Sequence, residues 1–135
     1  MTDKESDWAQ QSPSLTLRAA VRQFNDGDYF LCHETLEDLW IGEERPIRNV
    51  YQGILQIGIG LLHLQRGNKP GARTLLEQGM QRLQPFLPTC FKLDLASLCE
   101  EATKILNRLN DPTHEQPLFF PGKGPQIRII EPPAS

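Results

Sequence analysis

The sequence has few cysteines and no long apolar run, and each shortage excludes a class of protein. Its 135 residues include three cysteines without a CxxC spacing, Cys32, Cys90 and Cys99. An odd number without that spacing argues against a disulfide framework and predicts reduced, buried thiols in a reducing compartment. The longest apolar stretch, residues 50–64, is about 15 residues long, against the roughly 20 that a bilayer requires. Residues 1–12 are polar and do not resemble a secretory signal. We therefore expect a cytoplasmic protein without a membrane-spanning segment.

Strong charge of one sign is also missing. The chain has 17 acidic and 14 basic residues, which gives a net charge of -3. Nucleic-acid binding requires a basic stripe, and attraction to an anionic membrane requires a basic cluster, so neither partner is expected. No glycine-rich phosphate loop follows a predicted strand, and no GxSxG motif is present. The absence of a complete catalytic motif favours a protein that is not an enzyme.

The residues that are present predict one all-α domain. The length suits a single domain, and 39% hydrophobic residues are enough for one core. We expect residues 1–12 to be a polar, disordered N-terminus, residues 13–110 to form the helical domain and residues 111–135 to form an irregular, extended, proline-rich tail. Within that tail, residues 126–130 have a strand-like pattern, but a lone strand would have no sheet to join.

Five segments have helical periodicity and recognisable stops. The first runs from about Leu15 to Asn25 and ends at Gly27, and the second from Tyr29 to about Ile41 behind Asp28. The third begins near Pro46 and ends at Arg66, before Gly67 and Asn68. The fourth opens at Pro70 with an apolar face that reaches Leu83, and the fifth, capped by Asp94, reaches Leu109. Short connections predict antiparallel helical hairpins.

The third helix is expected at the centre, because it is apolar on nearly every side. Its glycines, Gly53, Gly58 and Gly60, each cost about 1 kcal/mol relative to alanine, and close approach of another helix is the usual compensation. At 100° per residue, Gln52, Gln56 and His63 fall within about 40° of one another. Buried amides and imidazoles need hydrogen-bond partners. The second helix offers His33 and Glu37 beside Trp40, with Glu34 further towards solvent, so a buried polar network between these two helices is predicted.

This predicted cluster has three interpretations. The preferred one is a non-catalytic binding or scaffold protein, in which the network sets helix register and lines a small pocket for a small ligand or a protein partner. In the second, a metal-dependent hydrolase, His33, Glu37 and His63 bind a divalent metal and Glu34 is the general base. No cofactor is expected in the first interpretation. A His-Glu-x-x-Glu run is not the HExxH motif of zinc proteases, which weakens the second.

The third interpretation is an interaction module of the tetratricopeptide kind. Gly27 precedes Leu36 and Glu37 by the same spacing by which Gly67 precedes Leu76 and Glu77, at an offset of about 40 residues. Such a module would have an exposed apolar groove. The sequence leaves the partner and a homo-oligomeric state open.

Two strings of the sequence resemble a known family. They are FNDGDYFLCHETLEDLW, residues 24–40, and YQGILQIGIGLLHLQRGNKPGARTLL, residues 51–76. Together they are similar to the bacterial and archaeal family called domain of unknown function 309. The resemblance implies a small all-α helical-hairpin fold and a family without an established biochemical activity. The family often has an acidic residue at the position of Leu31, and the leucine here argues against a carboxylate-rich metal site.

Overall fold

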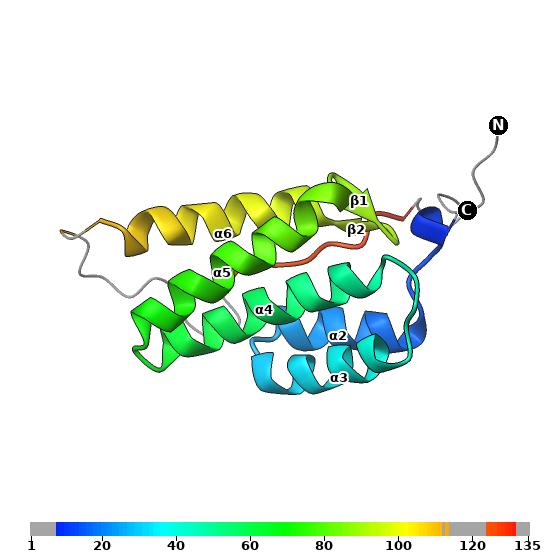
Figure 1. Cartoon of the computed structure of the whole chain (residues 1–135), viewed down its shortest axis with the longest axis horizontal. Helices are drawn as coiled ribbons and strands as arrows, with labels where there is room; N and C mark the ends of the chain where they lie inside the picture. Colours follow the sequence, from blue (N-terminus) through cyan, green and yellow to red (C-terminus); the bar gives the residue numbers. More distant parts are fainter. Residues whose placement is uncertain (1–7, 112, 114–123, 132–135) are drawn as a thin grey trace.

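The computed structural model describes residues 8–111, 113 and 124–131. Five α-helices dominate it, as predicted: α2 (Leu15–Asn25), α3 (Tyr29–Ile41), α4 (Arg48–Gln65), α5 (Lys69–Leu83) and α6 (Leu95–Leu109). The remaining elements are two 3-10 turns, η1 (Trp8–Gln10) and η2 (Gln84–Phe86), and two short strands, β1 (Thr89–Cys90) and β2 (Leu93–Asp94). The helices lie side by side, with α6 at one edge and α2 and α3 at the other (Figure 1). The all-α fold is confirmed. Over the described residues, none of the helices combines the length and apolarity that a bilayer-spanning segment needs.

Local signals set the helix ends. Gly27 and Gly67 have φ of +83° and +82°, a left-handed conformation that glycine adopts without steric cost, and each ends the turn between two antiparallel helices. Asp94 caps α6, because its carboxylate accepts a hydrogen bond from the Ser97 backbone N–H at 3.0 Å. Asn68 caps α5 in the same way through the Gly71 N–H. Asp28 is at the predicted N-cap of α3, but its side chain makes no capping hydrogen bond.

The core joins the apolar faces of all five helices. The buried residues of α2 are Leu17, Ala20, Val21 and Phe24, and they repeat at helical spacing, as do the buried residues of α6. Leu36 of α3, Ile57 of α4 and Leu76 of α5 are fully buried. Burial of each such side chain stabilises the fold by about 1.5–3 kcal/mol relative to full exposure. In this arrangement α4 packs against α3 on one side and α5 on the other (Figure 1).

Glycines let α4 and α5 approach each other closely. A Cβ atom at Gly79 would lie 2.7 Å from the Gly53 carbonyl oxygen, and one at Gly60 would lie 3.3 Å from the Ala72 carbonyl oxygen. The predicted compensation for mid-helix glycine is therefore present at Gly53 and Gly60. Gly58 differs, since a Cβ atom there would make ordinary contacts of 3.7 Å and more with Phe24 and Tyr29.

Two expectations about the chain ends need correction. Residues 8–10 form a 3-10 turn with contacts to the body of the protein: Phe91 donates its backbone N–H to the Ala9 oxygen at 2.7 Å, and the Trp8 ring meets the Phe91 ring edge-on. The end segment also finds a strand to pair with, because Ile129 bridges Leu93 of β2 and Ile127 is buried. The β1–β2 hairpin that offers this edge was not predicted. Residues 1–7, 112, 114–123 and 132–135, which include most of the predicted tail, lie outside the described residues.

Candidate functional site

The predicted pair on α3 forms, but at the surface. His33 and Glu37 are one helical turn apart, and the His33 Nε2 atom lies 3.3 Å from a Glu37 carboxylate oxygen. Their side chains are 29% and 51% exposed, and Glu34 is exposed as well. The prediction that Glu37 is buried is therefore wrong. The other ring nitrogen of His33, Nδ1, is buried and has no hydrogen-bond partner in the part of the chain that the structure describes.

Trp40 has a packing role that the sequence did not indicate. Its half-buried ring faces the Arg48 guanidinium, which lies 4.5 Å from the ring centre. This cation–π contact joins the end of α3 to the first residue of α4 and contributes about 0.5–1 kcal/mol at a partly exposed site. Trp40 therefore helps to close the α3–α4 hairpin.

The polar stripe on α4 faces more than one neighbour. Gln56 is 9% exposed, and its amide contacts α5: Arg82 Nε donates to Gln56 Oε1 at 3.1 Å, and Gln56 Nε2 donates to Gln78 Oε1 at 3.5 Å. His63 lies at the end of α4, where its Nδ1 atom is 3.3 Å from the Asn68 side-chain amide. Gln52 is half-buried, with no side-chain hydrogen bond among the described residues.

The predicted site residues are therefore not brought together as one network. Across residues 8–111, 113 and 124–131, no hydrogen bond joins the His33–Glu37 pair to Gln52, Gln56 or His63. Within the same ranges no three His, Cys, Asp or Glu side chains are grouped so that they could hold a metal ion. The proposed ligand set of His33, Glu37 and His63 is thus not assembled. The reason is that α4 has helical neighbours on two sides, and the glycines that let α5 approach closely bring Gln56 within reach of α5.

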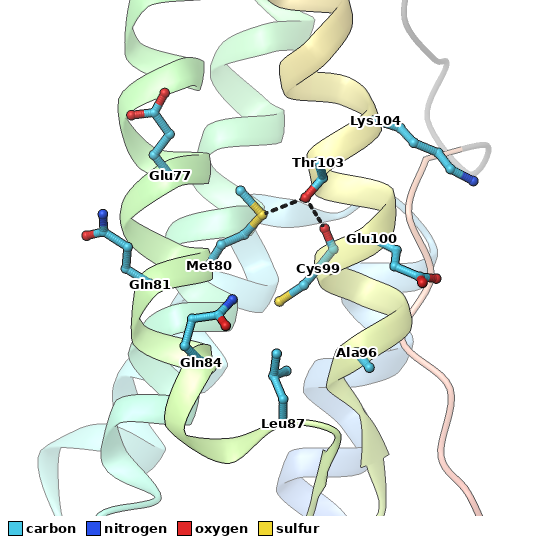
Figure 2. Close-up of a pocket in the computed structure, with 10 residues that line it drawn as sticks. All are labelled: Glu77, Met80, Gln81, Gln84, Leu87, Ala96, Cys99, Glu100, Thr103 and Lys104. Atoms are coloured by element: carbon cyan, nitrogen blue, oxygen red, sulfur yellow. Dashed lines mark hydrogen bonds between the residues drawn. The ribbon is translucent and has the colours of Figure 1, made fainter.

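A hollow lies elsewhere, between α5 and α6 (Figure 2). It is a groove of about 850 Å³ with ten lining residues: Glu77, Met80, Gln81, Gln84, Leu87, Ala96, Cys99, Glu100, Thr103 and Lys104. Met80, Cys99 and Leu87 lie between the two helices, whereas Glu77 and Glu100 lie on the outer flanks. The groove therefore has an apolar floor between polar rims, and its size is within the range of ligand-binding clefts.

The groove contains a thiol, that of Cys99, and a hydroxyl, that of Thr103. Burial raises the pKa of the Cys99 thiol above its usual value, so the neutral form predominates at pH 7. The Thr103 hydroxyl lies 2.8 Å from the Cys99 carbonyl oxygen and donates to it, so this proton is already engaged. Neither side chain is activated as a nucleophile. Sequence reasoning missed this groove, although the apolar faces of α5 and α6 were both predicted, because the angle between two packed helices is not a local property.

A smaller polar hollow of about 360 Å³ lies beside Gln56. Gln78, Gln81 and Arg82 of α5 are its other lining residues. Of the residues predicted for the functional site, Gln56 is the one that lines this hollow. Arg82 was not predicted, although it is one turn after Gln78 and on the same side of the helix.

Comparison with known proteins finds a matching family model and similar bacterial proteins. Residues 17–75 match the family model described as "Domain of unknown function (DUF309)". The chain is 38% identical over 58 residues to "Uncharacterized protein YpuF" of Bacillus subtilis (strain 168), which covers 42% of this chain and 33% of that protein. It is 28% identical over 65 residues to an "Uncharacterized protein" of Aquifex aeolicus (strain VF5), covering 47% of this chain and 20% of that one.

These matches confirm the resemblance seen in the sequence and mark its extent. The chain spans a third or less of the length of both relatives. The family match covers α2, α3, α4 and the first half of α5. All ten groove residues come after the matched segment. The groove is thus a feature of this chain's own C-terminal half.

Proposed function

Residues 17–75 match the DUF309 family model, and from that starting point we propose that the protein is a non-catalytic helical binding protein whose α5–α6 groove takes an amphipathic helix of a partner protein. The observation that carries this proposal is the spacing of the lining residues. On α5 they are Glu77, Met80, Gln81 and Gln84, and on α6 they are Ala96, Cys99, Glu100, Thr103 and Lys104.

Both sets repeat at intervals of three and four residues, so each forms one stripe along its helix. Two such stripes side by side provide a furrow into which the ridge of a third helix fits. The furrow follows about two turns of each helix, a length that suits the i, i+3, i+4 and i+7 anchors of a helix bound in a groove.

The chemistry of the furrow indicates the character of the partner. Met80 and Cys99 on the floor have polarisable sulfur atoms, and the flexible methionine adapts to apolar side chains of different shape. Glu77 flanks the floor from α5 and Glu100 flanks it from α6. These two carboxylates outnumber the one ammonium group of the lining, that of Lys104 on α6, so the rims favour a partner helix with lysine or arginine beside its apolar stripe. The inert thiol and hydroxyl favour binding over catalysis.

The proposal can be tested with a synthetic amphipathic peptide of leucine and lysine and its leucine–glutamate counterpart, by calorimetric titration of the full chain. We expect saturable binding of the lysine peptide. Ala96→Trp, which fills the floor, is expected to weaken binding at least about tenfold, and the double variant Glu77→Gln/Glu100→Gln about threefold to tenfold through lost attraction.

Two controls make the result specific. Thr16→Trp adds the same ring to an exposed position on α2, and Glu44→Gln removes a carboxylate from an exposed position before α4. Neither should change the affinity. Equal binding of both peptides, or equal loss in Ala96→Trp and Thr16→Trp, would refute the assignment of the groove.

A further inference from the structure

The polar hollow between α4 and α5 has an arrangement of donors that the binding groove does not explain. The Arg82 guanidinium is fixed at its edge by two amide oxygens: Nε donates to Gln56 Oε1 at 3.1 Å, and Nη1 donates to Asn49 Oδ1 at 3.2 Å. Both acceptors come from α4, and the Gln56 side chain is buried. The guanidinium is therefore held in place before any ligand arrives.

The direction of these hydrogen bonds determines which groups remain available. Arginine only donates, so the Gln56 oxygen must face Arg82 and the Gln56 amide nitrogen must face Gln78. That nitrogen donates to Gln78 Oε1 at 3.5 Å, which occupies the oxygen of Gln78. The Gln78 amide nitrogen and the remaining N–H groups of Arg82 are then left as donors beside the hollow. These donors are exposed beside the hollow, where an acceptor ligand can bind to them in place of water.

Among the described residues, no carboxylate forms an ion pair with Arg82. In the described ranges the ion pairs involve other basic residues, and Arg82 has amide partners alone. Amide oxygens orient a guanidinium without cancelling its charge. Arginine presents several N–H donors in a planar fork that matches the oxygens of carboxylate and phosphate groups.

We propose that this hollow is a binding site for a small oxyanion, with Arg82 and the Gln78 amide as its donors. The observations that carry the proposal are the oriented guanidinium without a carboxylate partner among the described residues and a relay through buried Gln56 that leaves the Gln78 amide nitrogen and Arg82 as donors. A phosphate group and a carboxylate share the required chemistry, with acceptor oxygens and negative charge. The volume of about 360 Å³ accommodates either. The hollow shares Gln81 with the rim of the α5–α6 groove, and its other lining residues belong to the hollow alone.

The test is a titration of the 15N-labelled full chain with sodium phosphate at constant ionic strength, followed by NMR at the arginine Nε–Hε and glutamine side-chain resonances. Arg73 is an internal control, because it is on the same helix and its Nε also donates to an amide oxygen, that of Asn110 at 2.9 Å, outside the hollow. We expect saturable shifts at Arg82 and Gln78 in the millimolar range, and none at Arg73. A parallel titration with sodium acetate separates the two ligand classes: saturation by one salt only assigns the site to that anion.

A variant gives a second, independent readout. Gln78→Glu keeps the side-chain shape and supplies a carboxylate to Arg82, so the affinity for phosphate should fall at least about tenfold. Gln65→Glu adds the same charge at an exposed position near the end of α4 and should leave the affinity unchanged. Far-ultraviolet circular dichroism checks that both variants fold. Shifts that fail to saturate, shifts shared by Arg73, or equal affinity in wild type and Gln78→Glu would overturn the proposal.

Discussion

Replacing a glycine of α4 or α5 with alanine should have two opposing effects on stability, a gain in helix propensity and a loss from steric contact. Alanine in place of a mid-helix glycine stabilises a helix by about 1 kcal/mol when space allows. At Gly79 the added Cβ atom would lie 2.7 Å from the Gly53 carbonyl oxygen and 2.7 Å from Ile57 Cγ1. The first of these is backbone inside a packed helix, so it can move aside only if the two helices separate.

The expected magnitude follows from these distances. Overpacking of a core costs about 1–3 kcal/mol, and contact with backbone on the facing helix places this case at the upper end. After the gain in helix propensity is subtracted, Gly79→Ala should lower the free energy of unfolding by about 2 kcal/mol. For Gly58→Ala, where contacts with Phe24 and Tyr29 would be 3.7–3.8 Å, the propensity gain should remain and raise it by up to about 1 kcal/mol.

The assay is urea unfolding monitored by circular dichroism, with the slope compared across wild type and both variants. Equal slopes assign the changes to stability rather than to a changed denatured state. A Gly79→Ala protein as stable as wild type would show that α4 and α5 are not in close contact at this glycine. If Gly58→Ala lowered the free energy of unfolding as much as Gly79→Ala, glycine would be required on α4 for a reason other than space.

Two further predictions concern titratable side chains. The backbone N–H of Ser97, followed by the Ser97 hydroxyl and Arg128, holds the pKa of Asp94 below its usual value. Asp94→Asn should therefore cost about 1–2 kcal/mol at pH 7 by denaturant unfolding, because the hydrogen bonds to a charged carboxylate are lost. The cost should shrink as the pH falls from about 4, where Asp94 of the unfolded chain is protonated, through the lower pKa of the folded state; a cost independent of pH would contradict this account. Burial raises the pKa of Cys32 to about 12 and that of Cys90 to about 11, so both thiols should react with a disulfide reagent at pH 8 far more slowly in the native protein than in urea, and rapid native labelling would show that they are accessible.

Features specified by neighbouring residues could be predicted from the sequence. Gly27 and Gly67 end their helices because the required left-handed conformation is a property of single residues. The buried faces of α2 and α6 follow from helical spacing, which is also local. The His33–Glu37 pair formed for the same reason, since residues four apart on a helix are neighbours.

Features that depend on which elements meet could not be predicted in this way. A helical wheel gives the direction of Gln56 around α4 but not whether α3 or α5 lies in that direction. The partner of the Gln126–Ile130 segment was missed because the edge it joins comes from a two-residue strand, which has no sequence period. Exposure of Glu37 was missed because half-buried positions lie at the margin of an apolar stripe, where small rotations decide contact with water.

Residues 124–131 contact the segment that matches the family, so that segment depends on residues outside it. Asn25, inside that segment, donates its side-chain amide to the Ile127 carbonyl and accepts the Ile127 N–H through its oxygen, and Arg128 contacts the Asp94 cap of α6. Residues about a hundred positions apart in sequence thus complete each other's hydrogen bonding, and closing so long a loop is entropically costly unless both ends are already ordered. A fragment cut at the limits of the family match would leave Asn25 without these partners. It would also expose the apolar side chains that bury Ile127. In this protein the segment that matches the family is therefore completed by contacts with residues outside it.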